Sequence, residues 1–413
     1  MRRWQDAQVP SQQNTPRTVD AHRATVAALL PRTPVVRLPL ADCLGLAVAE
    51  PVSAPLPLPP FDNSAMDGYA VRAVDVAAAT VDTPVELPVD EDVPAGRIDS
   101  PPLQPGTAHR IMTGAPMPPG SDAVVRVEHT DGGLHRVRID TPGAPGANLR
   151  RAGDDVATGD VVLPTGTVLG PAQLGVAAAV GYAQLPVHRR LRALVLSTGS
   201  ELVEPGRPLA HGQIYESNAA LLAAAVREAG GHAEQLHFVP DDVGQLDATL
   251  ADRLEGVDLL VTSGGVSAGA YEVVKDAMGG RGVEFVRVAM QPGGPQGAGH
   301  YRGVAVAALP GNPVSSSVSF EVFVRPAMRA AMGLPPARRS ATARLGSELD
   351  SPPGKRQYRR GTFDAATGTV SPVGGPGSHL LGALARSDSL IEIDEDTTQL
   401  PAGTAVPVLL TSS

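Results

Sequence analysis

One stretch near the middle of the chain constrains the fold most: an apolar strand, a loop of small residues and a short helix. The strand covers Val257–Val261, the loop Thr262–Gly269 and the helix Tyr271–Met278. This run is apolar except for Asp258, and such a run is typical of a strand buried on both faces of a parallel sheet. The loop glycines permit close backbone approach to a ligand, and a helix start favours an anion. A tight turn that binds nothing fits this loop alone equally well.

The surrounding sequence alternates strands with helices, which predicts a doubly wound sheet with a mainly parallel core. The expected strands are Leu191–Leu196, His232–Val239, Val257–Val261, Val283–Val288 and Val304–Leu309. The expected helices are one capped by Ser217 and ending at Gly230, then Asp242–Leu254, Tyr271–Met278 and Val314–Met332.

The segments before and after this α/β block have a different sequence pattern. Before it we expect helices from Thr18 or Asp20 to Leu30, around Ala41–Leu46 and over Pro171–Val180, with a proline-rich connector over Pro51–Pro60. Residues 60–148 alternate short β-rich pieces with Pro and Gly turns, which indicates a small β-domain. After Pro336 we expect no helices, only turns and short strands such as Leu390–Ile393.

Composition limits the function classes. The chain has 413 residues, 42% hydrophobic content and a net charge of −9, so we expect two to four domains and neither a nucleic-acid nor a membrane partner. The single cysteine, Cys43, excludes an intramolecular disulfide and a cysteine-cluster metal site. The polar first residues lack a signal-peptide pattern, so the cytoplasm is the expected location.

Polar loops follow or precede four of the predicted elements. They are Ser197–Glu201, Pro240–Asp242, Thr262–Gly269 and Leu309–Ser315. In a doubly wound sheet such loops meet at the carboxyl ends of the strands, where ligands bind. Their hydroxyls, backbone amides and carboxylates predict a phosphate-plus-metal site. Asp241 and Asp242 are also compatible with a plain helix cap.

Three further stretches combine polar and apolar residues in the same way. Pro60–Val71 carries Asp62 and Asp67, and Arg110–Pro116 and Asn148–Asp155 repeat its character. Acids in such loops serve either as turn-formers or as the edge of a metal or phosphate site. The basic run Gly354–Arg360 is either a solvated edge or an oxyanion site.

Five of these segments, in this order, resemble the molybdopterin molybdenumtransferases, the MoeA and gephyrin E-domain family. The segments are Pro59–Val71, Arg110–Pro116, Ser197–Leu202, Ser263–Gly269 and Leu309–Ser315. The resemblance implies a multidomain α/β and β fold. Its parts are an elongated discontinuous domain I (1–58 and 149–187), an inserted β-domain II (59–148), a molybdopterin adenylyltransferase-like α/β domain III (188–335) and a β-barrel-like domain IV (336–413). It also implies a homodimer with active sites between subunits.

The same resemblance implies a Mg²⁺-dependent reaction in which molybdate enters adenylylated molybdopterin, and molybdenum cofactor and AMP are released. The positions matching residues tied to activity are Asp67, Thr113, Asp155, Glu201, Asp241, Asp242 and Glu272, of which Glu201, Asp241, Asp242 and Glu272 would hold the metal. The expected substrate-binding residues are Ser263, Gly264, Gly265, Ser267, Arg287, Pro310, Asn312, Pro313, Ser315, Lys355 and Ser378. Molybdopterin adenylyltransferase and molybdoenzyme-maturation proteins are the implied partners.

Two departures from the family pattern bear on molybdate. A Lys-Pro-Gly-Lys-Pro stretch of the family reads Gln291-Pro-Gly-Gly294-Pro here, and Lys355 stands where arginine is usual. Molybdate is an anion, so lost lysines weaken its site, and lysine lacks the bidentate geometry of arginine. A paralogue that binds molybdopterin with weakened or lost insertion is therefore the alternative. A receptor-clustering scaffold is a second one. The sequence does not separate molybdate from tungstate.

Overall fold

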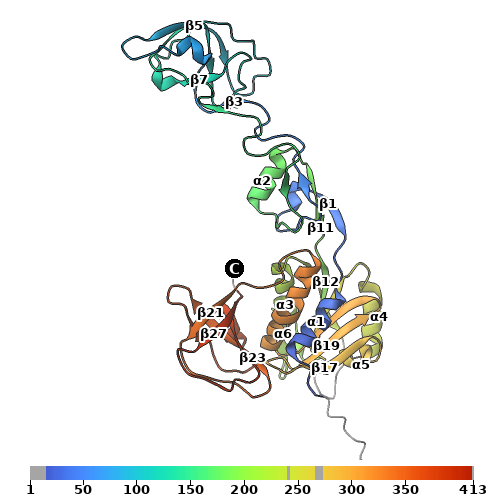
Figure 1. The fold of residues 1–413 in the computed structure, drawn as a ribbon. Helices are drawn as coiled ribbons and strands as arrows, with labels where there is room; N and C mark the ends of the chain where they lie inside the picture. Colours follow the sequence, from blue (N-terminus) through green and yellow to red (C-terminus); the bar gives the residue numbers. More distant parts are fainter. Residues whose placement is uncertain (1–14, 240–241, 266–272, 412–413) are drawn as a thin grey trace, which may run out of the picture. The chain divides into compact units, whose positions relative to one another are not determined.

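The computed structural model describes residues 15–239, 242–265 and 273–411, and it consists of two compact units (Figure 1). Unit 1 contains the chain up to residue 36, residues 45–47 and everything from residue 188 onward. Unit 2 contains residues 37–44 and 48–187. The unit boundaries fall in or beside β1 (Val35–Pro39) and β11 (Gln184–His188), which pair with each other. The four-domain partition drawn from the resemblance stays a prediction.

The core of unit 1 is a six-stranded sheet. In sheet order its strands are β15 (His232–Val239), β12 (Arg192–Thr198), β16 (Leu259–Ser263), β20 (Val304–Leu309), β19 (Pro295–Tyr301) and β17 (Val283–Arg287). The first four run parallel and the last two pair antiparallel, so the predicted parallel core is confirmed. The sequence analysis missed β19. Its glycines meet close neighbours: a Cβ at Gly299 would lie 2.0 Å from the carbonyl oxygen of Gly282.

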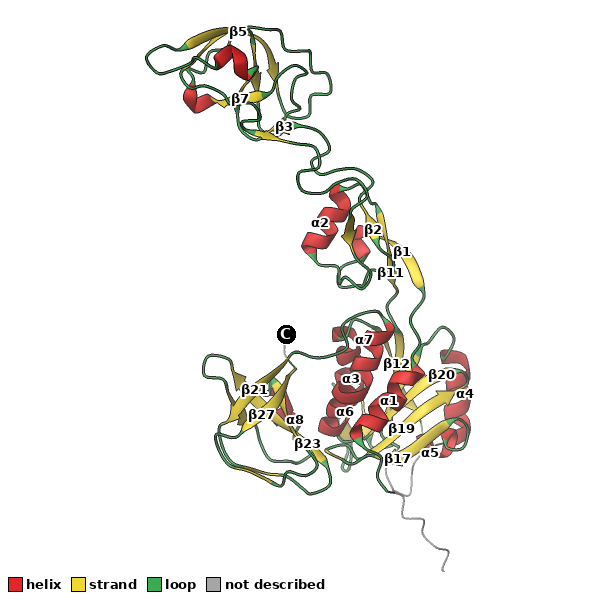
Figure 2. Ribbon diagram, in the orientation of Figure 1, coloured by secondary structure: helices red, strands yellow, loops and turns green. Residues whose placement is uncertain are grey.

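Helices cover both faces of this sheet (Figure 2). Side chains alternate between the faces along each strand, so Val195 and Val261 pack with one helical layer while Leu194 and Leu260 pack with the other. The first layer consists of α1 (Val19–Leu29), α3 (Asn218–Glu228), α6 (Pro313–Ser319), the π-helix Phe320–Val324 and α7 (Arg325–Ala331). The second consists of α4 (Val243–Arg253) and α5 (Val273–Met278).

The capping side chains predicted from the sequence form their hydrogen bonds, with one exception. Thr18 accepts a hydrogen bond from Ala21 N at the start of α1, and Asp242 accepts one from Gln245 N at the start of α4. Ser217 occupies the N-cap position of α3, but its side chain makes no capping bond. The neighbouring carboxylate of Glu216 takes that role instead.

The last part of the chain closes into a barrel-like sheet. Its strands are β23 (Arg356–Asp364), β24 (Thr369–Pro372), β21 (Ser340–Leu345), β27 (Ala405–Leu410) and β25 (Ser389–Ile393), with β25 pairing back to β23. The short strand β18 (Met290–Gln291) joins its edge, and β22 (Leu349–Asp350) pairs with β26 (Gln399–Leu400). The expectation of no helix after Pro336 is wrong, because α8 (Leu381–Ala385) forms one turn beside the barrel.

Unit 2 is built mainly of strands. Its five-stranded sheet contains β7 (Ala123–Arg126), β4 (Gly68–Val71), β6 (Ala108–Ile111), β5 (Val85–Val93) and β8 (Arg136–Ile139). The pairs β2 (Val52–Ser53) with β10 (Val161–Leu163) and β3 (Asn63–Ser64) with β9 (Leu149–Arg150) accompany the helix α2 (Pro171–Ala179).

The short helix predicted around Ala41–Leu46, where the chain passes between the two units, does not form. Only one 3₁₀ turn, Leu40–Asp42, forms there, because Gly45 (φ 76°) takes a left-handed conformation that breaks a helix. Across the described ranges, no helix is long and apolar enough to cross a membrane.

Candidate functional site

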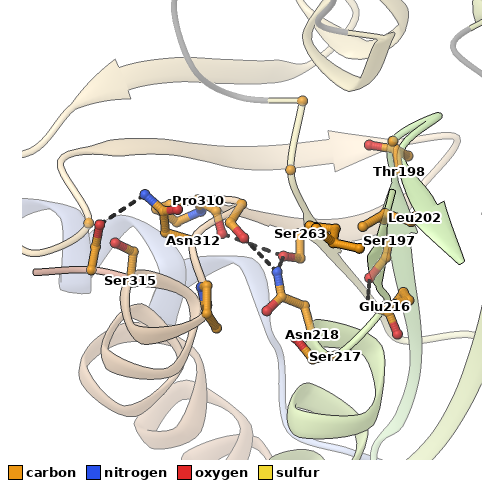
Figure 3. A pocket seen from close by; sticks show the side chains of 18 of the residues that line it. Ser197, Thr198, Leu202, Glu216, Ser217, Asn218, Ser263, Pro310, Asn312 and Ser315 are labelled. Atoms are coloured by element: carbon orange, nitrogen blue, oxygen red, sulfur yellow. Dashed lines mark hydrogen bonds between the residues drawn. The ribbon is translucent and has the colours of Figure 1, made fainter. Parts of the chain in front are cut away.

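A pocket of about 920 Å³ lies at the carboxyl ends of β12, β16 and β20 in unit 1 (Figure 3). Three of the four loops expected there line it, namely those after β12, after β16 and before α6. The C-terminal barrel contributes one further wall. Among the residues that line the pocket are Ser197, Glu201, Ile214, Tyr215, Glu216, Asn218, Ser263, Gly264, Gly265, Gln291, Pro310, Gly311, Asn312, Pro313, Ser315, Gly377 and Ser378.

The three loops meet backbone to backbone because glycines stand at their contacts. Gly264 (φ 93°) has a left-handed conformation, and a Cβ there would lie 3.0 Å from the carbonyl oxygen of Thr198. A Cβ at Gly311 would lie 3.4 Å from the Cα of Gly264. Larger residues at these two glycines would therefore push the loops apart and change the floor of the pocket.

Asn218 ties two of these loops together (Figure 3). Its Nδ2 donates to Ser263 Oγ at 2.7 Å and to the carbonyl oxygen of Gly311 at 2.6 Å. Its Oδ1 is buried with no hydrogen-bond partner in the described part of the protein. A buried acceptor without a partner costs free energy, so this oxygen needs a partner from water or from a bound molecule.

Glu216 is a buried carboxylate that the sequence analysis did not select. It is 5% exposed, and its Oε1 accepts from Ser197 Oγ at 2.9 Å and from Ala219 N at 2.7 Å. The carboxylate thus joins the end of β12 to the start of α3. No local motif signals this, because the partner hydroxyl lies 19 residues earlier in the chain.

The wall from the C-terminal barrel is fixed to the start of α6. Asn312 Nδ2 donates to Ser378 Oγ at 2.9 Å, and Val314 N donates to the carbonyl oxygen of Ser378 at 3.1 Å. Behind this wall, Arg360 (3% exposed) donates to the carbonyl oxygens of Gly375 and Gly377. Burial, followed by the charge of Arg359, lowers the pKa of the Arg360 guanidinium.

The electrostatic character of the pocket is unusual for an anion site. Among its described lining residues there is no Lys, Arg or His side chain, and there are two carboxylates, Glu201 and Glu216. The described lining therefore offers an anion hydroxyls and backbone amides, with the guanidinium of Arg360 buried behind the wall. Gln291 lines the pocket where the family stretch begins with lysine, and it accepts a hydrogen bond from Gln357 at 3.2 Å.

The predicted site residues fall into four groups, one of which lies outside the described residues. Those that line the pocket are Glu201, Ser263, Gly264, Gly265, Pro310, Asn312, Pro313, Ser315 and Ser378. Arg287, Lys355 and the capping residue Asp242 belong to unit 1 but do not line it. Asp67, Thr113 and Asp155 belong to unit 2. Asp241, Ser267 and Glu272 lie outside the described residues, so their placement and the roles of the whole set stay predictions.

Two of the unit 2 residues form a local pair. The backbone N and the Oγ1 of Thr113 both donate to Asp67 Oδ1 at 2.7 Å. These hydrogen bonds, the backbone one first, lower the pKa of the exposed Asp67 carboxyl. Asp155 is exposed elsewhere in unit 2, where its N donates to the carbonyl oxygen of Leu58. Within the described ranges, no three His, Cys, Asp or Glu side chains gather as a metal cluster.

Comparison with known families first defines the class of protein. Residues 194–330 match the model described as "Probable molybdopterin binding domain", and this segment contains most of the pocket. Residues 17–181 match the "MoeA N-terminal region (domain I and II)", and residues 342–411 match the "MoeA C-terminal region (domain IV)". The class of protein is therefore one with a molybdopterin-binding-type domain between MoeA N-terminal and C-terminal regions.

Individual relatives cover nearly the whole chain. Molybdopterin molybdenumtransferase 2 of Mycobacterium tuberculosis is 54% identical over 95% of this chain and 99% of its own length. Molybdopterin molybdenumtransferase of Haemophilus influenzae is 34% identical over 95% and 98%. The crystal structure of a molybdopterin biosynthesis MoeA protein from Pyrococcus horikosii has a TM-score of 0.84 at 30% identity, covering 97% of this chain and all of the other. This chain belongs to the MoeA family.

Proposed function

We propose that the chain is a molybdopterin molybdenumtransferase of molybdenum cofactor biosynthesis, which inserts molybdate into adenylylated molybdopterin and releases AMP. The observation that carries this is the pocket at the carboxyl ends of β12, β16 and β20, built from the family's own loop segments. A close relative at 54% identity bears the name of the same activity. Cleavage of a phosphate anhydride needs a site that positions the phosphates and neutralises developing charge, which hydroxyls and amides of these loops support.

Glu201 is the proposed carboxylate ligand for Mg²⁺ in this pocket. No described residue hydrogen-bonds to the Glu201 side chain. The second lining carboxylate, Glu216, already accepts hydrogen bonds from Ser197 and Ala219 of the protein itself. Mg²⁺ is commonly bound by one or two carboxylates together with substrate phosphates, so the residues present fit it. When bound, the ion would neutralise part of the phosphate charge. Asp241, Asp242 and Glu272 remain proposed additional ligands.

Ser263 and Ser315 are proposed to hold phosphate oxygens, since both line the pocket and carry hydroxyl donors. Ser378, with the charge of Arg360 behind it, is proposed to face the molybdate. We also infer a cytoplasmic reaction and a homodimer, as the family resemblance implies. The adenylyltransferase that supplies the substrate and molybdoenzyme-maturation proteins that take the product are the proposed partners.

The test is AMP release by the purified chain from adenylylated molybdopterin in the presence of Mg²⁺ and molybdate. We expect release that requires all three, and a loss of about 100-fold or more in Glu201→Gln, because the charge that holds the metal is gone. Glu204→Gln is the matched control, since Glu204 is an exposed carboxylate of the same segment that does not line the pocket.

The less favoured alternative is a paralogue that binds molybdopterin without inserting metal. It predicts tight molybdopterin binding with no molybdate-dependent AMP release in the same assay. Absence of both binding and release by well-folded protein would refute the proposed function and this alternative together.

A further inference from the structure

Large exposed apolar side chains are concentrated at one place in unit 1. Apart from Val35, those in the described part of the unit are Leu209, Ile214 and Tyr215, which are 43%, 55% and 44% exposed. All three belong to the segment between β13 (Leu202–Val203) and α3, and Ile214 and Tyr215 line the pocket. Single exposed apolar residues need no explanation, but a group at a pocket is typical of a ligand-binding surface.

Tyr215 stands out within this group because aromatic residues are scarce and several of them are fully buried. The chain has 6 Tyr, 6 Phe and 1 Trp, and Tyr69, Tyr358, Phe320 and Phe323 are among its most completely buried side chains. Among the described residues that line the pocket, Tyr215 is the only aromatic one. The other lining side chains are mostly small and polar, and they offer no flat apolar surface to a ring.

The structure holds the Tyr215 ring in place. Its strand β14 (Ile214–Tyr215) pairs with β13, and its hydroxyl donates to the carbonyl oxygen of Arg207 at 2.9 Å. The next residue, Glu216, is anchored by Ser197 and Ala219 through its carboxylate. A ring fixed by its backbone and by its hydroxyl loses little freedom when a ligand stacks on it.

We propose that Tyr215 is a stacking platform for the planar nitrogen heterocycle of the substrate. This inference rests on the proposed function, and it assigns Tyr215 as a residue that selects and orients the ring. The ring is either the adenine or the pterin, since both have the flat π surface that an aromatic side chain recognises. Ile214 N donates to the carbonyl oxygen of Glu201 at 3.0 Å, so the platform is hydrogen-bonded to the backbone of the proposed metal ligand.

Calorimetric titration with three probes separates the sources of the ring. AMP carries adenine, molybdopterin carries the pterin, and ribose 5-phosphate carries a phosphate without any planar nitrogen heterocycle. The variants are Tyr215→Ala, which removes the ring, and Tyr215→Phe, which keeps the ring but loses the bond to Arg207. Leu209→Ala is the matched control, because Leu209 is a similarly exposed apolar residue that does not line the pocket.

We expect Tyr215→Ala to weaken binding of one ring-bearing probe by about 5- to 150-fold, the usual range for a lost base–aromatic stack. Tyr215→Phe should stay within about threefold of the wild type, since the stacking face remains. Ribose 5-phosphate binding should be unchanged in both variants. A loss for AMP alone identifies adenine as the stacked ring, and a loss for molybdopterin alone identifies the pterin.

Three results would overturn the platform. The first is that Tyr215→Ala binds AMP and molybdopterin as tightly as the wild type does. The second is that its affinity for ribose 5-phosphate falls as much as its affinity for the ring-bearing probes. The third is that Leu209→Ala loses as much affinity as Tyr215→Ala. In each case, AMP release by the wild type would still support the proposed function. If wild-type protein binds none of the probes and releases no AMP, the platform and the proposed function fall together.

Discussion

At the scale of single residues, Gly199 makes room for the side chain of Glu201. Gly199 has φ 152°, and a Cβ built on it would lie 2.7 Å from Glu201 Oε2 and 2.8 Å from Oε1. The clash is with the end of a flexible side chain, so the carboxylate would move while the strand stays in place. We expect Gly199→Ala to fold and to lose about 100-fold in AMP release, since a displacement near 1 Å at a reacting group has that effect.

Gly206→Ala is the control for backbone strain in that experiment. Gly206 has φ 92° and no heavy atom within 4 Å of a built Cβ. Both variants should lose about 1–2 kcal/mol of unfolding free energy from the left-handed backbone. Equal activity of the two variants in the AMP assay would show that the position of the Glu201 carboxylate does not limit the reaction.

Gly294 tests the missing lysine of the family stretch. A Cβ at Gly294 would meet only ordinary contacts, the nearest being the Val288 carbonyl oxygen at 3.5 Å. A cation about 4 Å from one negative charge of the bound oxyanion contributes about 1–4 kcal/mol at dielectrics between water and the protein surface. We therefore expect Gly294→Lys to lower the molybdate concentration needed for AMP release by about fivefold to several hundredfold.

Gly294→Lys should leave the affinity for molybdopterin unchanged, because the added charge is expected to act on the oxyanion. Gly175→Lys adds the same charge on the exposed side of α2 in unit 2, where a built Cβ meets nothing within 4 Å. Molybdate titrations of the two variants and the wild type, run at one ionic strength, decide the matter. Coincident curves would mean that position 294 is not beside the oxyanion or that Arg360 already neutralises it.

The pocket residues differ in how far the sequence could reveal them. Ser263, Gly264 and Asn312 stand in local segments whose composition signals a ligand loop, so they were predictable without a structure. Glu216 and Tyr215 were not, because their importance comes from tertiary contacts. The carboxylate of Glu216 is buried only when Ser197 arrives from another strand. Tyr215 is notable only because it is an exposed aromatic residue that lines the pocket.

At the scale of elements, strong local signals gave correct predictions and tertiary effects caused the misses. The helices α1 and α4 carry a capping side chain, Thr18 or Asp242, directly before a periodic apolar run, and both were predicted within about two residues. Strand β19 reads as a loop because it contains one proline and two glycines. Those glycines are required by the close neighbours across the sheet, which the sequence alone does not show.

Helix α1 also contains a titrating group that links stability to pH. His22 is 1% exposed, packs edge-on against Phe323 at 4.7 Å, and its Nδ1 has no partner in the described residues. Burial, then the charge of Arg17, lowers its pKa to about 4, while Glu284 acts in the opposite direction. The unfolded chain therefore takes up a proton near pH 6.5 that the folded chain does not accept until about pH 4.

We expect the stability that comes from this pKa difference to be fully present above pH 6.5 and to be lost as the pH falls towards 4. The lost stability is about 3 kcal/mol for a shift of this size. His22→Phe keeps a ring against Phe323 and removes the titration, so its unfolding free energy should fall less across this pH range. His211→Phe, at an exposed position, is the control. Parallel pH profiles for wild type and His22→Phe, from denaturant unfolding, would contradict the assignment.

At the scale of the whole molecule, the predicted site residues are divided between two compact units. Glu201 lies in unit 1, while Asp67 and Thr113 lie in unit 2. Both sets are proposed to act on one substrate. In a homodimer with sites between subunits, unit 2 of one chain would complete the pocket of the other. The chain mass is 42.4 kDa, so light scattering should give about 85 kDa at micromolar concentration for such a symmetric dimer.

Mixing two inactive variants distinguishes a shared site from a site within one chain. Asp67→Asn and Glu201→Gln are each expected to be inactive as pure proteins, because each removes a carboxylate from every site. After subunit exchange in an equal mixture, half of the dimers carry one variant of each kind. If Asp67 of one chain serves the pocket of its partner, each mixed dimer has one intact site, and about a quarter of wild-type AMP release should return. If both carboxylates belong to one chain's site, no mixed dimer has an intact site and the mixture stays inactive. Mixing Glu201→Gln with Gly199→Ala, two changes in the same unit, is the control that should recover no more than the residual activity of Gly199→Ala.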